Sequence, residues 1–233
     1  MKLFLFDIDG TLVWTRGAGR AAMLDALERF FPPDGAFHER VRERMDKHVF
    51  GGKTDWLTLA ELLGGEGYTV DTIGQLIGDF DRMMGDSMER VISGYDVQPC
   101  TGGLMCVQQL KARPDVRLAL VTGNVRSSAP IKLRAAGYDP ADFPVGAYGD
   151  EALERDHLPP LAHSRAIHYY DHRFQAEDVL VVGDTLADIQ CAKAAGFPVA
   201  VVCTGFEKRE LLEAAQPDYL LDNLTQLIPA VFS

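Results

Sequence analysis

Four short runs of apolar residues, each about as long as a β-strand, punctuate the sequence at 3–6, 118–121, 179–182 and 199–202. None alternates with polar residues, which is the pattern of parallel strands covered on both faces. Between the last two runs, residues 186–195 carry apolar positions at helical spacing and end at Gly196, which indicates a βαβ unit. A helix at 207–215 and a weak strand at 219–221 follow. Residues 1–14 and 98–233 are therefore predicted to form one doubly wound α/β domain with a parallel sheet.

The stretch between these two parts has a different pattern. Residues 15–97 show helical periodicity at 21–31 and 55–63 and contain no run of four β-branched residues. We therefore predict a helical insertion after the first strand. Its entry and exit must both lie near the carboxyl end of that strand, so the insertion is expected to cover whatever lies there.

Polar residues end the four apolar runs. Asp7, Thr122, Asp184 and Thr204 are found at or just after the ends of the predicted strands. Asp and Thr are common in turns, so any one of them could simply mark a strand exit. In an open parallel sheet, however, the carboxyl ends of neighbouring strands converge on a ligand crevice. The four together predict a shared site.

Two carboxylates lie close to each other at the first of these ends. Asp7 and Asp9 are spaced i, i+2, which on an extended chain places both side chains on one side, roughly 7 Å apart. Gly10 then allows a sharp turn. With Asp184 added, these charges would repel one another unless a cation lay among them. A divalent ion with oxygen ligands, Mg²⁺ above all, meets that requirement and would also neutralise an incoming phosphate.

Composition narrows the classes of function. Of 233 residues, 47% are apolar and 24% charged, as in ordinary globular proteins. The longest apolar runs are about six residues, far short of the ~20 that a membrane span requires. The net charge of −11 argues against nucleic acid and against an anionic membrane, and favours a small substrate. The N-terminal residues lack a signal-peptide pattern, so we expect a cytoplasmic protein. Four cysteines in apolar contexts are expected to be buried free thiols: Cys100, Cys106, Cys191 and Cys203.

Three segments resemble, in order and separation, motifs I, II and IV of the haloacid dehalogenase-like hydrolase superfamily. They are Asp-Ile-Asp-Gly-Thr-Leu at 7–12, Thr-Gly-Asn at 122–124 and Gly-Asp-Thr-Leu-Ala-Asp at 183–188. The resemblance implies a Rossmann-like core. The insertion at 15–97 is similar to the helical cap of the phosphoglycolate phosphatase and β-phosphoglucomutase branches, so the resemblance also implies a cap that closes over the substrate and excludes water.

The resemblance also implies a role for each matching residue. Asp7 would be the nucleophile that becomes an aspartyl phosphate, and Asp9 the general acid and base. The Mg²⁺ ligands would be Asp7, Asp184 and the backbone carbonyl of Asp9, with Asp188 nearby. Thr122 and the amides of Gly123 and Asn124 would hold the phosphoryl oxygens. Gly10 and Thr11 are further candidates for phosphate binding.

Motif III departs from the family pattern. The family has a Lys about thirty residues after motif II, whereas residues 153–157 here read Leu-Glu-Arg-Asp-His. Arg155 is the favoured substitute, because a guanidinium suits phosphate. Lys132 is the rival, and we expect it about two turns into its helix and ~12 Å from the strand end.

Two weaker signals have simpler explanations beside the functional ones. Lys53 lies in a Gly-Gly-Lys-Thr-Asp segment at 51–55, which is either a loop that recognises the substrate or an ordinary capped helix start. Asp188 lies three residues after Thr185, a spacing that also fits a helix capping box.

The favoured function is hydrolysis of a small phosphorylated metabolite by a Mg²⁺-dependent phosphatase, with phosphoglycolate as a family-level candidate. A phosphomutase is the nearest alternative, because the same aspartyl phosphate can pass to a sugar hydroxyl. A dehalogenase is disfavoured, because that branch has no acid at the position of Asp9. A phosphoacceptor signalling module also places Asp residues and Mg²⁺ at strand ends, but its phosphoryl group persists.

Overall fold

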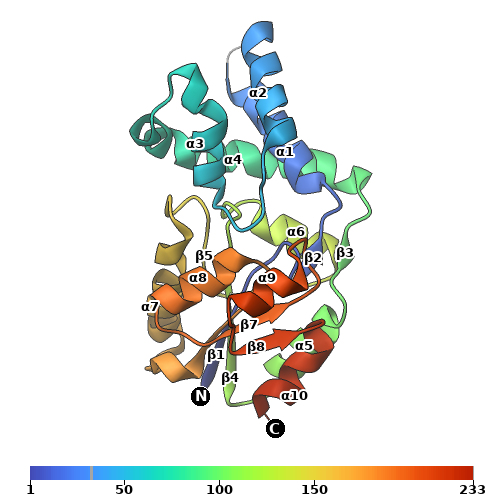
Figure 1. The fold of residues 1–233 in the computed structure, drawn as a ribbon, viewed down its shortest axis with the longest axis vertical. Helices are drawn as coiled ribbons and strands as arrows, with labels where there is room; N and C mark the ends of the chain where they lie inside the picture. Colours follow the sequence, from blue (N-terminus) through green and yellow to red (C-terminus); the bar gives the residue numbers. More distant parts are fainter. Residues whose placement is uncertain (32–33, 233) are drawn as a thin grey trace.

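Six parallel strands form a single sheet in the computed structural model, which describes residues 1–31 and 34–232 (Figure 1). Across the sheet the order is β5 (Gly146–Ala147), β4 (Val116–Val121), β1 (Lys2–Phe6), β6 (Val179–Gly183), β7 (Val199–Val202) and β8 (Tyr219–Leu221). Each neighbouring pair is parallel. The predicted strands are confirmed, with ends that differ by at most two residues. Within this sheet, β5 is the strand that the sequence did not predict.

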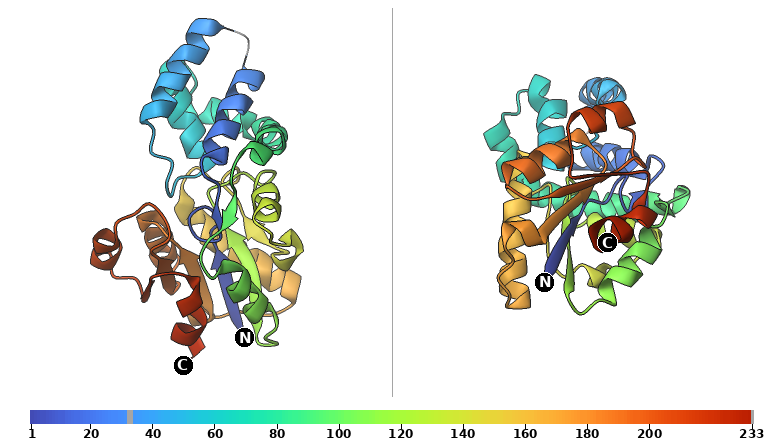
Figure 2. Two further views of the ribbon diagram at one scale, coloured as in Figure 1. Left: turned by 90° about the vertical axis from the view of Figure 1, so that its right-hand side faces the viewer. Right: turned by 60° about the horizontal axis from the view of Figure 1, so that its bottom comes forward.

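Helices cover both faces of this sheet (Figure 2). On one face lie α5 (Gly103–Lys111), α6 (Ala129–Ala135) and α10 (Leu227–Phe232), and on the other α7 (Leu158–Tyr170), α8 (Leu186–Ala194) and α9 (Arg209–Ala214). Alternate residues of each strand face opposite layers: Phe4 and Phe6 join the first cluster, Leu3 and Leu5 the second. Burial on both faces explains the unbroken apolar runs and confirms the doubly wound α/β fold.

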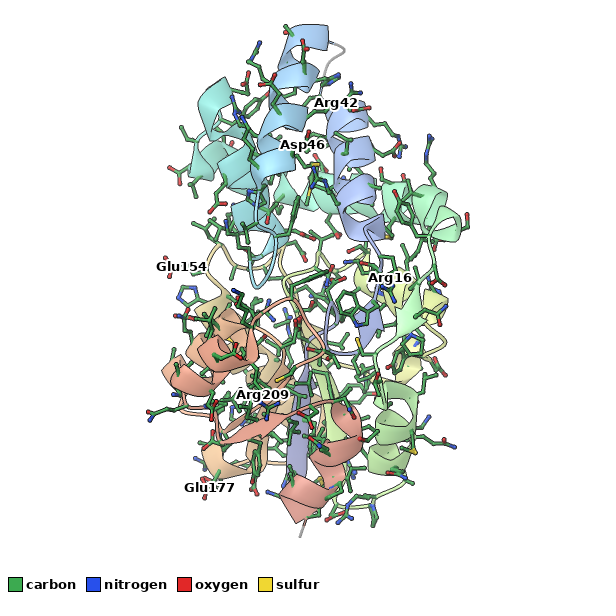
Figure 3. All side chains as sticks on the ribbon, turned by 45° about the vertical axis from the view of Figure 1, so that its right-hand side comes forward. Arg16, Arg42, Asp46, Glu154, Glu177 and Arg209 are labelled. Carbon is green, nitrogen blue, oxygen red and sulfur yellow. The ribbon has the colours of Figure 1, made fainter. Side chains whose placement is uncertain are left out.

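The residues between β1 and β4 form a helical bundle with its own apolar cluster. Its helices are α1 (Ala18–Phe30), α2 (Gly35–Lys47), α3 (Asp55–Leu63) and α4 (Val70–Val91). Met23, Leu27, Leu59 and Phe80 are among its buried side chains. The bundle lies over the carboxyl end of the sheet, whereas both chain termini lie at the opposite end (Figures 1 and 2). In Figure 3, Arg16 and Glu154 mark the level at which bundle and sheet meet.

Two short strands connect the bundle to the core. β2 (Val13–Trp14) and β3 (Gln98–Pro99) pair antiparallel, so the chain enters and leaves the bundle at one place. This pairing accords with an insertion at 15–97, although the boundaries of a separate cap domain stay a prediction. Six 3₁₀ helices complete the described elements: η1 (Gly64–Glu66), η2 (Ile92–Gly94), η3 (Pro140–Asp142), η4 (Arg155–His157), η5 (Ala176–Asp178) and η6 (Leu224–Gln226).

The structure also bears on two predictions made from the composition, the absence of a membrane span and the state of the cysteines. Within residues 1–31 and 34–232, no helix has both the length and the apolar character to cross a bilayer. The cytoplasmic location stays a prediction. All four cysteines are free thiols, and three are buried, whereas Cys203 is partly exposed.

Candidate active site

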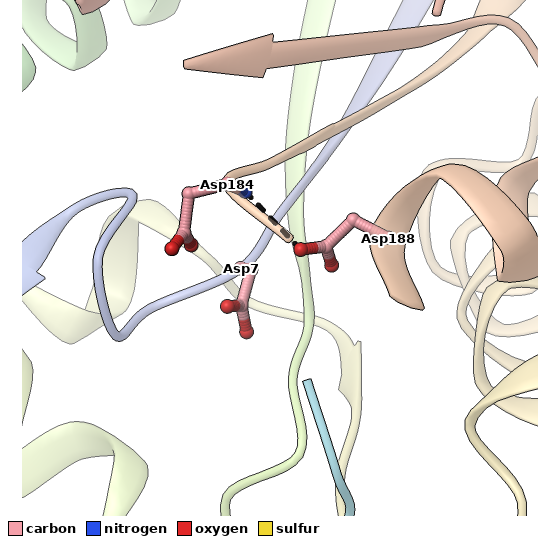
Figure 4. Close-up of side chains that lie close together, drawn as sticks. All are labelled: Asp7, Asp184 and Asp188. Atoms are coloured by element: carbon pink, nitrogen blue, oxygen red, sulfur yellow. Dashed lines mark hydrogen bonds between the residues drawn. The ribbon is translucent and has the colours of Figure 1, made fainter. Parts of the chain in front are cut away.

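Three carboxylates from distant parts of the chain meet at the carboxyl end of the sheet. Asp7 directly follows β1, Asp184 directly follows β6, and Asp188 lies in the first turn of α8. The Asp7 amide still donates to the carbonyl of Val182, at 2.9 Å, so the hydrogen bonding of the sheet fixes its position. One oxygen of each carboxylate lies within 4.8 Å of the other two, and all three residues are buried (Figure 4).

Burial perturbs the ionisation of this cluster. It raises the pKa of Asp7 from 3.8 to about 6, against the attraction of Arg155, and the neighbouring charges of Asp188 and Asp9 raise it further. Burial, followed by the charges of Asp188 and Asp7, also raises the pKa of Asp184 well above its ordinary value. The protein alone therefore disfavours full ionisation of these groups.

The donor set fits a hard divalent cation. It consists of oxygen atoms only, from three buried carboxylates within reach of one another. Carboxylate oxygens are the ligands that Mg²⁺ takes in proteins. A cation at this place would also favour the ionised forms of Asp7 and Asp184, whose pKa values are raised by burial and by the neighbouring carboxylates.

Arg155 supplies a positive charge beside the cluster. It is the first residue of η4 and is 8% exposed. Its Nη2 donates to Asp188 Oδ1 at 2.5 Å and lies 3.1 Å from Asp7 Oδ1. The guanidinium therefore links the candidate nucleophile to a candidate metal ligand, and one further nitrogen donates to the Gly52 carbonyl at 3.4 Å.

Asp9 has a different set of partners. Its Oδ2 accepts hydrogen bonds from Lys132 Nζ at 2.6 Å and from Asn124 Nδ2 at 2.8 Å, and its Oδ1 accepts one from Thr15 Oγ1 at 3.3 Å. The Asp9 side chain is 41% exposed, whereas that of Lys132 is 4% exposed. Asp9 is thus held at both carboxylate oxygens while part of its side chain stays exposed.

The position of Lys132 corrects the sequence analysis. Lys132 was expected ~12 Å from the strand end, on the assumption that its helix starts directly after motif II. In the structure α6 begins at Ala129, so Lys132 lies in its first turn and its ammonium contacts both Asp9 and Asn124. Both rival cations therefore reach the site, Arg155 beside Asp7 and Lys132 beside Asp9.

Motif II forms a tight turn after β4. The Thr122 hydroxyl accepts hydrogen bonds from the Asn124 amide at 3.3 Å and from Asn124 Nδ2 at 2.8 Å. A Cβ at Gly123 would lie 2.0 Å from the Lys53 carbonyl oxygen, so only glycine fits there. The turn is therefore packed against the bundle on one side and against Asp9 on the other.

Gly10 and Thr11 lie against Asp184. Gly10 has a φ of +82°, and a Cβ there would lie 2.2 Å from Asp184 Oδ2. The Thr11 hydroxyl donates to Asp184 Oδ1 at 2.8 Å. Thr204, which the sequence analysis placed at a strand end, donates to the Gly10 carbonyl at 2.6 Å. These contacts orient Asp184, and the part of Gly10 and Thr11 in phosphate binding stays a prediction.

Comparison with known proteins identifies the family. The family model of the haloacid dehalogenase-like hydrolases matches residues 1–196. The chain belongs to that family. The resemblance of its motifs is therefore confirmed, and the protein is a hydrolase.

Relatives of this hydrolase match over nearly its whole length. Pyrophosphatase PpaX from Bacillus thuringiensis (strain Al Hakam) is 26% identical over 225 residues, which span 97% of this chain and 94% of the relative. A hydrolase from Pseudomonas syringae has the same fold, with a TM-score of 0.67 and 19% identity over 98% of this chain and 97% of that one. CbbY from Rhodobacter sphaeroides, solved in complex with phosphate, has a TM-score of 0.64 and 19% identity over 97% and 96% of the two chains.

Lys53 is a predicted substrate-binding residue, and that role stays a prediction. The Lys53 ammonium pairs with Glu61 of α3. Its backbone nevertheless belongs to a loop that packs on the core, and a cavity of about 280 Å³ lies between residues 51–54, η4 and α8. Thr54 caps α3, as expected if this segment is an ordinary capped helix start. Its hydroxyl also donates to the Leu153 carbonyl at 2.8 Å.

Sequence reasoning missed the carboxylate of Asp55. Its Oδ2 accepts the Val125 amide at 2.9 Å, directly after motif II. Burial raises the pKa of Asp55 to about 6, and Lys132 opposes that rise. A carboxylate in the first turn of a predicted helix is usual. Nothing in the neighbouring sequence indicates that the Asp55 carboxylate accepts a hydrogen bond from the core. The capping box of Thr185 and Asp188, in contrast, is present as its spacing predicts.

Proposed function

We propose that this hydrolase is a Mg²⁺-dependent phosphatase that acts on a small phosphorylated metabolite through an aspartyl phosphate on Asp7. The observation that carries the proposal is the buried cluster of Asp7, Asp184 and Asp188 with Arg155 beside it. Three carboxylates and one guanidinium leave a surplus of negative charge that a divalent cation would balance. Bound Mg²⁺ would supply charge neutralisation for the phosphoryl oxygens.

In the first step Asp7 acts as the nucleophile. One carboxylate oxygen of Asp7 attacks phosphorus, the bond from phosphorus to the leaving oxygen breaks, and Asp9 donates a proton to that oxygen. The Asp7–Arg155 contact of 3.1 Å supports this step, because it keeps a guanidinium beside the proposed nucleophile, within reach of a phosphoryl group bound there. Arg155 and the motif II amides would stabilise the charge that develops there.

In the second step Asp9 acts as a base. It takes a proton from a water molecule, the water oxygen attacks phosphorus, and the bond to Asp7 breaks, which releases phosphate and regenerates the Asp7 carboxylate and the protonated Asp9. The hydrogen bonds of Asp9 to Lys132 and Asn124 support this role, because they hold the carboxyl group while 41% of its side chain stays accessible.

The substrate is proposed to be small because the helical bundle lies over the carboxylates. Relatives named as pyrophosphatase and fold neighbours named as phosphatases make pyrophosphate and phosphoglycolate the first compounds to test. Phosphate release from a panel of phosphorylated metabolites, with Mg²⁺ and with a chelator, tests the proposal. Asp7→Asn should abolish release, and Asp9→Asn should lower it by about a hundredfold or more.

Each other outcome of that panel has a distinct meaning. Undiminished phosphate release by Asp7→Asn would refute the aspartyl-phosphate route. Transfer of the phosphoryl group to a second hydroxyl of a sugar phosphate would show the phosphomutase, and a stable stoichiometric phosphoprotein without turnover would show the signalling module.

A further inference from the structure

Three successive backbone amides directly after motif II are each bound by a carboxylate. The segment is 125–127, which precedes α6. The pairs are Val125 with Asp55 Oδ2 at 2.9 Å, Arg126 with Asp150 Oδ1 at 2.8 Å, and Ser127 with Asp81 Oδ1 at 2.8 Å. Asp55 and Asp81 belong to the helical bundle, and Asp150 to the core. The bundle thus supplies two of the three acceptors of a segment adjoining the phosphate-binding turn.

Asp55 holds this turn from both sides. Its amide donates to the Gly123 carbonyl at 2.7 Å, while its carboxylate accepts the Val125 amide. The residue between them is Asn124, whose side chain donates to Asp9 at 2.8 Å. The geometry of Asn124, and through it the position of Asp9, therefore depends on a residue of the bundle.

A second contact adjoins the first. The Trp56 amide donates to the Gly149 carbonyl at 3.1 Å, and the Gly149 amide donates to the Asn124 carbonyl at 2.7 Å. A Cβ at Gly149 would lie 1.8 Å from the Gly123 carbonyl oxygen, so the approach leaves no room for a side chain. The first turn of α3, the motif II turn and the loop after β5 are thus joined by backbone hydrogen bonds.

Asp81 makes the corresponding contact from α4. Besides accepting the Ser127 amide, it accepts the Ser127 hydroxyl at its backbone carbonyl, at 2.5 Å. One turn further along, a Cβ at Gly85 would lie 2.7 Å from both Cβ and Oγ of Ser127. The helix therefore approaches the segment closely and binds it through directed hydrogen bonds. Bonds from amides to carboxylates are roughly twice as strong as neutral ones.

We propose that Asp55 and Asp81 are positioning residues that complete the phosphate-binding turn only when the bundle rests on the core. With the bundle in place they fix 123–127, so that the motif II amides and Asn124 take the geometry that phosphate and Asp9 need. When the bundle lifts, the turn loses both acceptors. The inference rests on the proposed function for its kinetic consequence, but not for the contacts themselves.

The kinetic test compares four variants. Asp55→Ala and Asp81→Ala are expected to lower kcat/KM by about tenfold to a hundredfold and to weaken inhibition by inorganic phosphate, because each removes a charged hydrogen bond to the turn. Asp55→Asn keeps an acceptor oxygen and should restore most of the loss. Asp86→Ala is the matched control, because the Asp86 side chain is exposed on α4 and makes no hydrogen bond or ion pair with the described part of the chain.

Amide hydrogen exchange without substrate provides a readout that is independent of catalysis. Exchange of 123–127 should accelerate in both alanine variants and stay at the wild-type rate in Asp86→Ala. A purely structural role would instead loosen the bundle as a whole, lower the melting temperature and leave phosphate inhibition of the folded fraction unchanged. Should Asp55→Ala not fold, Asp81→Ala and Asp55→Asn carry the same comparison.

The outcomes separate this inference from the proposed function. A wild-type protein that releases no phosphate from any compound would refute the phosphatase, while the exchange experiment would still test the contacts. An active wild type whose alanine variants keep its kcat/KM, phosphate inhibition and exchange rates would overturn the positioning role.

Discussion

Replacing Asp7 with Asn is expected to stabilise the metal-free protein while it abolishes activity. Asp7 is 5% exposed and lies among Asp184 and Asp188, and these surroundings raise its pKa from 3.8 to about 6. At neutral pH the folded protein therefore holds an ionised group that its surroundings disfavour. Asn has nearly the shape of the protonated carboxyl group but cannot ionise, so the variant avoids this penalty.

The pKa shift sets the magnitude and the sign. A rise from 3.8 to about 6 is about two units, and at 1.36 kcal/mol per unit this is about 3 kcal/mol. Because the folded-state pKa is raised, the protonated group favours folding at low pH, and that contribution is lost as the pH rises through about 6. The gain of Asp7→Asn should therefore be about half complete at pH 5 and constant above pH 7. For a chain of this length it corresponds to about 6 to 12 °C in Tm.

Urea unfolding followed by circular dichroism, in the presence of a chelator, measures this gain. Asp9→Asn is the control: Asp9 is 41% exposed and bound by Lys132, so its replacement removes an ion pair and should bring no gain. Added Mg²⁺ should reverse the order of stability, since the cation stabilises the charged wild type. A variant that is no more stable than wild type at pH 8, or equally stabilised at pH 5 and pH 8, would refute the reasoning.

Two further predictions follow from single contacts. Arg155→Ala should lower kcat/KM by about a hundredfold or more at every pH, whereas Lys132→Ala acts through Asp9 and should also change the pH profile of kcat; identical profiles in steady-state assays would contradict this division. Gly10→Ala should cost about 2 kcal/mol or more, because φ is +82° and the new Cβ would meet Asp184, and an unchanged melting curve would show that the turn can relax.

The strands could be predicted because a strand that is buried on both faces has an unbroken run of apolar residues. Residues 3–6 are apolar throughout because alternate side chains face two helix layers. β5 could not be predicted in this way, because its two residues, Gly146–Ala147, are too few to form an apolar run. Among the helices, α3 matches its predicted bounds of 55–63, whereas α1 begins three residues before its predicted start at 21. There the N-cap is Gly17 in the left-handed region, without a side-chain cap to signal it.

The site residues at the strand ends could also be predicted from the sequence, because the topology of the sheet alone brings them together. Asp7 and Asp184 follow adjacent strands of the sheet, so a correct strand order places both at one edge. The contact made by Asp55 could not be predicted in this way. Its partner is the Val125 amide, 70 residues away, and that contact exists only because the bundle folds back onto the core.

Lys132 shows why the two cations could not be assigned from spacing. Counting helical rise from Asn124 assumes that α6 starts there, but the chain first makes the turn that external carboxylates bind, and α6 starts at Ala129. That turn brings Lys132 back over Asp9, while Arg155 reaches Asp7 from the opposite helix layer. A choice of one cation was therefore too narrow, because Asp7 and Asp9, the proposed nucleophile and the proposed acid–base residue, are each in contact with a different cation. With Asp184 and Asp188 included, the carboxylates exceed the cations by two charges, which is the charge of one Mg²⁺ ion.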